Sequence, residues 1–165
     1  RVPIDEAEGI VCTGPFSSLE DLDVYLPDFE FAKKRGLKLL CANPDIIVDR
    51  GSVREWCAGA LAKMYTDLGG ESLYFGKPFK PIYDLARRRL EASGVQIKNN
   101  RILAIGDGIT TDILGAEQEG IDSLFITGGL AALETGTKEQ PDQNLLKHYL
   151  DQQKLSPAYS IGFLR

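Results

Sequence analysis

One acidic segment has the residue types and the position expected of a metal site. Gly106-Asp107-Gly108 follows an apolar run at residues 102–105 and precedes a helical pattern that begins near Thr111 and Asp112. This order predicts a buried strand, a tight polar turn and a helix start. Ligands of α/β sheets bind at the carboxyl ends of the strands. Asp107 would therefore suit a hard cation such as Mg²⁺, whereas Asp112 could also cap the helix or bind loop amides.

Two further polar segments also follow apolar runs. Lys77, in Gly76-Lys77-Pro78, could reach an anion as a compact point charge, or it could be a surface lysine in a turn. Asn43 and Asp45, on either side of Pro44, could recognise a substrate or form a plain Asn-Pro turn. The sequence leaves these alternatives open for each segment taken alone.

Composition narrows the class of protein. Lys and Arg number 19 against 24 Asp and Glu, for a net charge of −5, so we expect no nucleic-acid partner. No apolar run approaches the roughly 20 residues of a membrane span, and we expect no membrane partner. The three cysteines share no metal-ligand spacing and are typical of buried thiols in a cytoplasmic protein. The chain has a single histidine, His148, which argues against a catalytic triad and against a His-rich zinc site.

Apolar runs and helical patterns alternate along the chain, which predicts an α/β fold with parallel strands. Strands are expected at residues 8–14, 37–42, 46–48, 73–75, 102–105 and 122–127. Helices are expected at 18–35, with an interruption or a restart at Pro27, and at 53–68, 81–93, 111–119 and 144–154. Residues 157–164 could form a last strand or an extended tail.

The three polar segments, in this order, resemble motifs of the haloacid dehalogenase-like (HAD) phosphatase superfamily. The nearest group is subfamily IIA, which contains p-nitrophenyl-phosphatase-like and nucleotide-phosphatase-like enzymes. Gly76-Lys77-Pro78 resembles the third motif, and the segment from Gly106 to Ile113 resembles the fourth. Asn43-Pro44-Asp45 and Gly59-Ala60-Leu61 resemble part of the inserted α/β cap. The resemblance thus implies part of a cap at residues 1–74 and the C-terminal half of a Rossmannoid HAD-like core at residues 75–165.

The resemblance also implies a role for each candidate residue. Asp107 would bind Mg²⁺, and Lys77 and Asp112 would be catalytic, with Lys77 clamping the phosphate and Asp112 orienting the metal site. Asn43 and Asp45 would bind the substrate, together with Lys77. The expected activity is Mg²⁺-dependent hydrolysis of a small phosphorylated metabolite through a phospho-aspartate intermediate.

The nucleophile motif of that family, Asp-x-Asp-Gly after an early strand, is not evident in this chain. Asp21-Leu22-Asp23 has the spacing without the glycine, and Asp49 lacks the second aspartate. We therefore expect a C-terminal portion that is inactive alone. The strand at residues 102–105 would then be an exposed apolar edge, covered by the remainder of the parent chain or by a homo-oligomer.

Three alternatives remain open at this point. The chain could be a catalytically incomplete HAD-like binding or regulatory domain. It could be a nucleotide-binding Rossmann protein, although Thr111 stands where the third glycine of the fingerprint belongs. It could be a receiver-like domain, although Lys77 precedes Asp107, which is the wrong order for that class.

Overall fold

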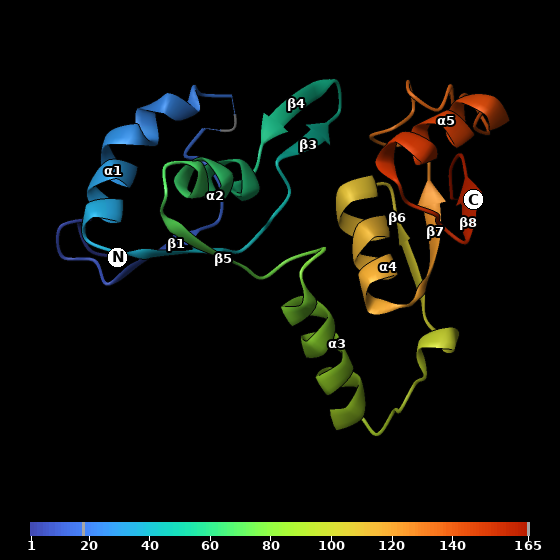
Figure 1. Cartoon of the computed structure of the whole chain (residues 1–165), viewed down its shortest axis with the longest axis horizontal. Coiled ribbons are helices and arrows are strands. Elements are labelled where there is room, and N and C mark those ends of the chain that lie inside the picture. The colour runs from blue at the N-terminus through green and yellow to red at the C-terminus, as the bar shows by residue number, and fades with distance from the viewer. Residues whose placement is uncertain (18, 165) are drawn as a thin grey trace. The chain divides into compact units, whose positions relative to one another are not determined.

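The structure is a computed structural model that describes residues 1–17 and 19–164. The chain divides into two compact units, Arg1–Lys77 and Pro78–Arg165, so that the boundary falls inside the Gly76-Lys77-Pro78 segment. Each unit combines helices with a parallel sheet (Figure 1), and the expected α/β class is confirmed. None of the described helices has both the length and the apolar character that a bilayer span requires.

The first unit is built on a three-stranded parallel sheet of order β1-β2-β5. Its strands are β1 (Gly9–Cys12), β2 (Lys38–Cys41) and β5 (Glu71–Tyr74), and its helices are α1 (Leu26–Lys34), preceded by a 3-10 turn at Leu22–Tyr25, and α2 (Ala58–Asp67). Of the two roles expected for Pro27, the structure shows the restart, since α1 begins at Leu26 and Pro27 lies in its first turn, where the missing N–H removes no helical hydrogen bond.

The core of the first unit lies between the sheet and its helices. Tyr65 of α2 is fully buried and stacks at a tilt against Phe29 of α1, with ring centroids 5.3 Å apart. The Tyr65 hydroxyl donates to the Leu37 carbonyl oxygen at 2.5 Å, which satisfies the one polar group that the ring carries into the core. These contacts fix both helices relative to β2, whose carboxyl end carries Asn43 and Asp45.

The expected helix at residues 53–68 is wrong over its first four residues. Val53–Trp56 forms β4, which pairs antiparallel with β3 (Ile47–Arg50), and the hairpin extends away from the parallel sheet of its unit (Figure 1). Gly51, at φ +65°, opens the two-residue connection that allows this pairing. Two cross-strand ion pairs, Asp49 with Arg54 and Arg50 with Glu55, stabilise the pairing of β3 with β4. The segment therefore forms a hairpin, although the spacing of its apolar residues also fits a helix.

The second unit contains a second three-stranded parallel sheet, of order β6-β7-β8. Its strands are β6 (Leu103–Gly106), β7 (Asp122–Ile126) and β8 (Tyr159–Ile161), and its helices are α3 (Lys80–Ala92), α4 (Leu114–Glu119) and α5 (Gln143–Gln153). A 3-10 turn at Asn99–Arg101 precedes β6. The expected helix at residues 111–119 begins instead as a π-helical turn at Ile109–Ile113, which leads into α4.

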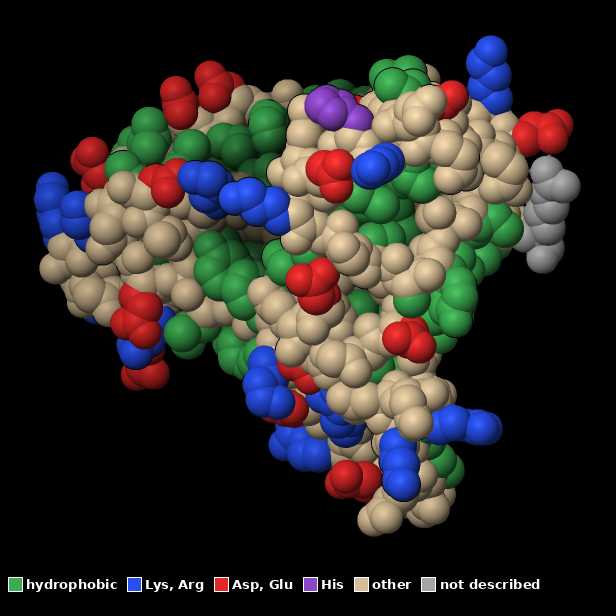
Figure 2. Space-filling model, turned by 45° about the vertical axis from the view of Figure 1, so that its right-hand side comes forward, with side chains coloured by type: hydrophobic (Ala, Val, Ile, Leu, Met, Phe, Trp, Pro, Cys, Tyr) green, Lys and Arg blue, Asp and Glu red, His purple; other side chains and the backbone are tan. Residues whose placement is uncertain are grey.

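The two faces of the second sheet differ in burial. On one face, Phe125 of β7 is fully buried in a cluster with Ile113 and Leu146. On the other face, Leu103 and Ile105 of β6 are 45% and 51% exposed and Tyr159 of β8 is 60% exposed. Within the described residues, β6 is also an edge strand of this sheet. Apolar side chains are visible at the molecular surface in Figure 2.

Candidate functional site

Asp107 lies directly after β6, at the carboxyl end of the strand, and its side chain is half-buried. The Leu130 backbone N–H, from the loop that follows the neighbouring strand β7, donates to Asp107 Oδ2 at 3.3 Å. In the described part of the chain, this is the one hydrogen bond made by that carboxylate, so Oδ1 remains available for a cation. Two strand ends therefore converge on one acidic group.

Gly129 allows the loop to approach Asp107 closely. A Cβ at position 129 would lie 2.0 Å from Asp107 Oδ2 and 2.7 Å from its Cγ, closer than real Cβ atoms come to other heavy atoms. Glycine is therefore required here for space rather than for a left-handed conformation. From the sequence, a predicted strand ends at residue 127, and Gly129 is not included in the candidate site.

Asp112 belongs to the same turn and lies in its π-helical part. Its Oδ2 accepts a hydrogen bond from the Gly108 backbone N–H at 3.1 Å. Its carboxylate packs on Gly106, where a Cβ would lie 2.1 Å from Asp112 Cγ. Of the roles considered for Asp112, bonding to a loop amide is thus present. This bond ties the turn that follows Asp107 to the helix behind it, and single π-helical turns are frequent at functional sites.

In the first unit, the structure brings together the two remaining segments. β2 and β5 are parallel neighbours, and the Phe75 N–H donates to the Cys41 carbonyl oxygen at 3.2 Å just beyond their ends. Pro44 packs against Gly76, where a Cβ would lie 2.1 Å from the Pro44 ring. The Asn43 loop and the exposed Lys77 therefore occupy the same end of this sheet.

The Asn43 loop also has a structural role. Asn43 Oδ1 accepts a hydrogen bond from the Asp45 backbone N–H at 3.3 Å, which is the turn geometry expected of Asn-Pro. The Asp45 carbonyl oxygen accepts from the Gly59 N–H at 3.0 Å, and this bond attaches the loop to the first turn of α2. Burial raises the pKa of the Cys41 thiol, just before the loop, to about 11, so this thiol is a poor nucleophile.

The acids considered as substitute nucleophiles are engaged elsewhere. Asp21 Oδ1 caps the 3-10 turn by accepting from the Asp23 N–H at 3.0 Å. Asp49 forms a bidentate ion pair with Arg54, and the hydrogen-bonded guanidinium lowers the pKa of the Asp49 carboxyl. The histidine, purple in Figure 2, is exposed on α5 and contacts Gln152. No group of three or more acidic, His or Cys side chains in the described residues could hold a metal ion by itself.

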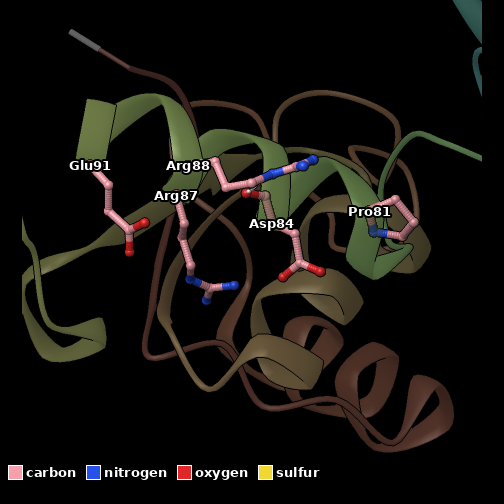
Figure 3. Close-up of a pocket in the computed structure, with 5 residues that line it drawn as sticks. All are labelled: Pro81, Asp84, Arg87, Arg88 and Glu91. Carbon is pink, nitrogen blue, oxygen red and sulfur yellow. Dashed lines mark hydrogen bonds between the residues drawn. The ribbon is translucent and has the colours of Figure 1, made fainter. Parts of the chain in front are cut away.

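A shallow hollow on the surface of the second unit carries no comparable chemistry. Figure 3 shows that its five labelled side chains all project from α3. Two of its four charged side chains have ion-pair partners, since Arg87 pairs with Glu119 and Asp84 with Lys80 at 2.7 Å. A furrow along a single helix does not enclose a ligand, and we assign it no role.

Comparison with known proteins gives a consistent family. Residues 74–151 match the family model Hydrolase_like, described as HAD-hydrolase-like. A solved hydrolase of the haloacid dehalogenase-like family from Brucella suis 1330 is 38% identical, with a TM-score of 0.80 over 100% of this chain and 58% of that chain. No curated protein sequence matches.

More distant solved structures share the fold. The p-nitrophenyl phosphatase from Archaeoglobus fulgidus is 20% identical, with a TM-score of 0.67 over 97% of this chain and 55% of that one. A thermostable NPPase double mutant from Geobacillus stearothermophilus is 24% identical, with a TM-score of 0.59 over 83% of this chain and 52% of that one. The chain thus spans a little over half the length of the solved proteins that it matches.

Proposed function

We propose that this chain, which matches the HAD-hydrolase-like family model over residues 74–151 and is 38% identical to a solved haloacid dehalogenase-like hydrolase, supplies the metal-binding aspartate and the phosphate-binding lysine of a Mg²⁺-dependent phosphomonoester hydrolase. The observation that carries this proposal is the environment of Asp107. Its carboxylate follows a parallel strand, receives one backbone N–H from the next strand's loop, and keeps Oδ1 available.

The residues present fit Mg²⁺ as the ion. Mg²⁺ is commonly held by one or two carboxylates, with waters and substrate phosphate oxygens completing its octahedron, rather than by a protein-only cage. Asp107 would be the direct ligand, and Asp112, which bonds to the Gly108 N–H in the same turn, would orient it. When bound, the ion would neutralise charge on the phosphoryl group.

Lys77 is proposed to clamp the phosphoryl oxygens. Its neighbour Pro78 packs in the second unit, where a Cβ at Gly115 would lie 3.1 Å from the Pro78 Cα. The support for this role is that Gly76-Lys77-Pro78 resembles the third motif of the family. The ammonium group of Lys77 would attract the phosphate of the substrate.

The chemistry requires a nucleophile, and the Asp-x-Asp-Gly motif that carries it in the family is not evident in this chain. In the proposed reaction, an aspartate carboxylate from outside the chain attacks phosphorus, and an O–P bond forms as the ester P–O bond breaks. The alcohol leaves with a proton from a neighbouring acid. Water then cleaves the phospho-aspartate, which releases inorganic phosphate and restores the carboxylate. Asn43 and Asp45 are proposed to contact the organic part of a small phosphorylated metabolite.

The exposed edge and face of the second sheet support a further element beside β6. Ile105, Leu124 and Tyr159 lie in one row across the three strands, because they are register partners, and two of them are more than half exposed. We propose that the remainder of the polypeptide, rather than a second copy, covers this row with a parallel strand. The solved relative from Brucella suis has the additional length for it, since this chain covers 58% of that protein.

The test is p-nitrophenyl phosphate hydrolysis by the natural polypeptide that carries this sequence, with and without Mg²⁺. We expect Asp107→Asn to lower kcat/KM by about 100- to 1,000-fold, as loss of an electrostatic catalytic group does. The matched control is Asp122→Asn, because Asp122 is an exposed aspartate at the opposite end of the same sheet. Full activity of the Asp107 variant would remove the assignment. A wild-type protein without Mg²⁺-dependent hydrolysis would favour a binding or regulatory domain.

A further inference from the structure

A cluster of threonine hydroxyls lies in the loop region that follows β7. Thr127 and Thr135 are fully buried, and Thr137 is half-buried. In the described residues, the buried polar side chains are these two threonines and Ser123. Burying a hydroxyl costs free energy unless its hydrogen bonds are replaced, so the partners of these groups indicate what the cluster holds in place.

The three hydroxyls are connected to one another and to the backbone. Thr137 Oγ1 donates to Thr127 Oγ1 at 2.8 Å, and Thr127 Oγ1 donates to the Ile161 carbonyl oxygen of β8 at 3.3 Å. Thr135 Oγ1 lies 2.7 Å from both Thr137 Oγ1 and the Ala131 carbonyl oxygen, and its single proton is shared between these two acceptors. The cluster therefore joins the end of β7, the end of β8 and the chain at position 131.

These attachments enclose the short loop that touches Asp107. Thr127 directly precedes the loop at residues 128–130, and Ala131, which Thr135 binds, directly follows it. Within the loop, the Leu130 N–H donates to Asp107 Oδ2. Buried hydroxyls thus bond at both ends of the segment that carries this donor, beside the backbone bonds from Thr127 N–H to the Ile161 oxygen and from Thr135 N–H to the Ala131 oxygen.

We propose that the Thr127, Thr135 and Thr137 hydroxyls form a positioning device that holds the Leu130 amide against the Asp107 carboxylate and so sets the affinity of the site for Mg²⁺. The claim about Mg²⁺ rests on the function proposed above, whereas the claim about the Leu130 amide does not. A hydrogen bond to the carboxylate orients this ligand although the donor does not touch the ion. A cluster with only a folding role would leave the Leu130 amide as protected as the rest of the loop.

The first experiment measures amide hydrogen exchange in the natural polypeptide that carries this sequence. Thr135→Val keeps the shape and removes the hydroxyl, and Thr135→Ser keeps the hydroxyl. We expect Leu130 to exchange about tenfold faster in Thr135→Val and at the wild-type rate in Thr135→Ser, with Phe125 unchanged. The control is Thr66→Val, which removes a similar bond, from the Thr66 hydroxyl to the Ala62 carbonyl oxygen at 3.0 Å in the first unit.

The second experiment titrates the same variants with MgCl₂ and follows the Asp107 and Leu130 amide resonances. We expect the midpoint to rise by about tenfold in Thr135→Val and to stay unchanged in Thr135→Ser and Thr66→Val. Unchanged Leu130 exchange in Thr135→Val would overturn the positioning role. Faster exchange with an unchanged midpoint would overturn its link to metal affinity. No Mg²⁺ response in the wild type would instead remove the metal assignment of the proposed function. If Thr135→Val does not fold, the half-buried Thr137→Val decides by the same criteria.

Discussion

Gly129 offers the most direct test of the geometry at Asp107. In Gly129→Ala, the added Cβ would lie 2.0 Å from Asp107 Oδ2, whereas real Cβ atoms essentially never come within 3.0 Å of another atom. The carboxylate must therefore move by at least about 1 Å, since repulsion rises steeply inside van der Waals contact. The added Cβ would also lie 2.6 Å from Asp107 Cβ, which rotation of the side chain cannot move, so the backbone at one of the two positions must shift together with the carboxylate.

The effect on activity should be large and the effect on stability small. A displacement of about 1 Å at a reacting group can cost about 100-fold in rate, so we expect kcat/KM to fall by that order. Overpacking typically costs about 1–3 kcal/mol, and the lower entropy of the unfolded alanine chain offsets about 0.4–1 kcal/mol. For a protein of this size or larger, a net loss of about 1 kcal/mol lowers Tm by about 2–4 °C.

The assay compares p-nitrophenyl phosphate hydrolysis and thermal melting of Gly129→Ala with those of Gly9→Ala. Gly9 is a suitable control because a Cβ there would meet only the Lys38 carbonyl oxygen, at 3.3 Å. Gly9→Ala should keep activity within about twofold of the wild type, as expected for a surface change distant from the site. A Gly129→Ala protein with wild-type kcat/KM would refute the reasoning, because the required displacement would then have no catalytic consequence.

Two further predictions concern the core and the open edge. Burial raises the pKa of Cys41 from 9.0 to about 11, so its contribution to the free energy of unfolding is complete below pH 9 and is lost as the pH rises toward 11. Tm should therefore fall over this range, and fall less in Cys41→Ala; equal pH dependence of the two melts would contradict the assignment. The isolated chain should self-associate through the exposed row at β6, and Ile105→Lys should reduce that association in size-exclusion chromatography. A cooperatively melting wild-type monomer would argue against the need for a covering strand.

The sequence predicted the strand ends better than the elements between them. The apolar run before Asp107 and the one at residues 37–42 became β6 and β2, because a continuous apolar run closed by polar residues is typical of a parallel strand. The burial expected of the strand before Asp107 is wrong within the described residues, because β6 lies at a sheet edge with Leu103 and Ile105 exposed. The hairpin at Ile47–Trp56 was missed, since Val53 and Trp56 fit a helical pattern equally well. Pairing across Gly51 is a tertiary outcome that local periodicity does not encode.

Only the acidic and basic side chains of the candidate site could be predicted from the sequence. Asp107, Asp112 and Lys77 have chemistry that the sequence displays, whereas the Leu130 donor is a backbone amide and has no residue type of its own. Backbone N–H groups commonly donate to anions, including carboxylates, but every residue except proline has such a group, so its residue type does not mark it in the sequence. The available signal was a pair of glycines after the strand adjacent to the Asp107 strand, and it becomes informative only once β6 and β7 are known to be neighbours.

A carboxylate at a strand end is weak evidence for a metal site, because aspartate is frequent in turns for reasons of backbone bonding alone. Asp107 differs from such turn residues in how its environment is built. A glycine makes room for it, an amide from another strand's loop fixes one oxygen, and buried threonines fix that loop from both ends. This arrangement places three costly features, namely a close backbone approach, buried hydroxyls and a half-buried acid, around one oxygen that the described residues leave available. Stability alone would be served more cheaply by apolar residues, and we therefore attribute the arrangement to the chemistry of that oxygen.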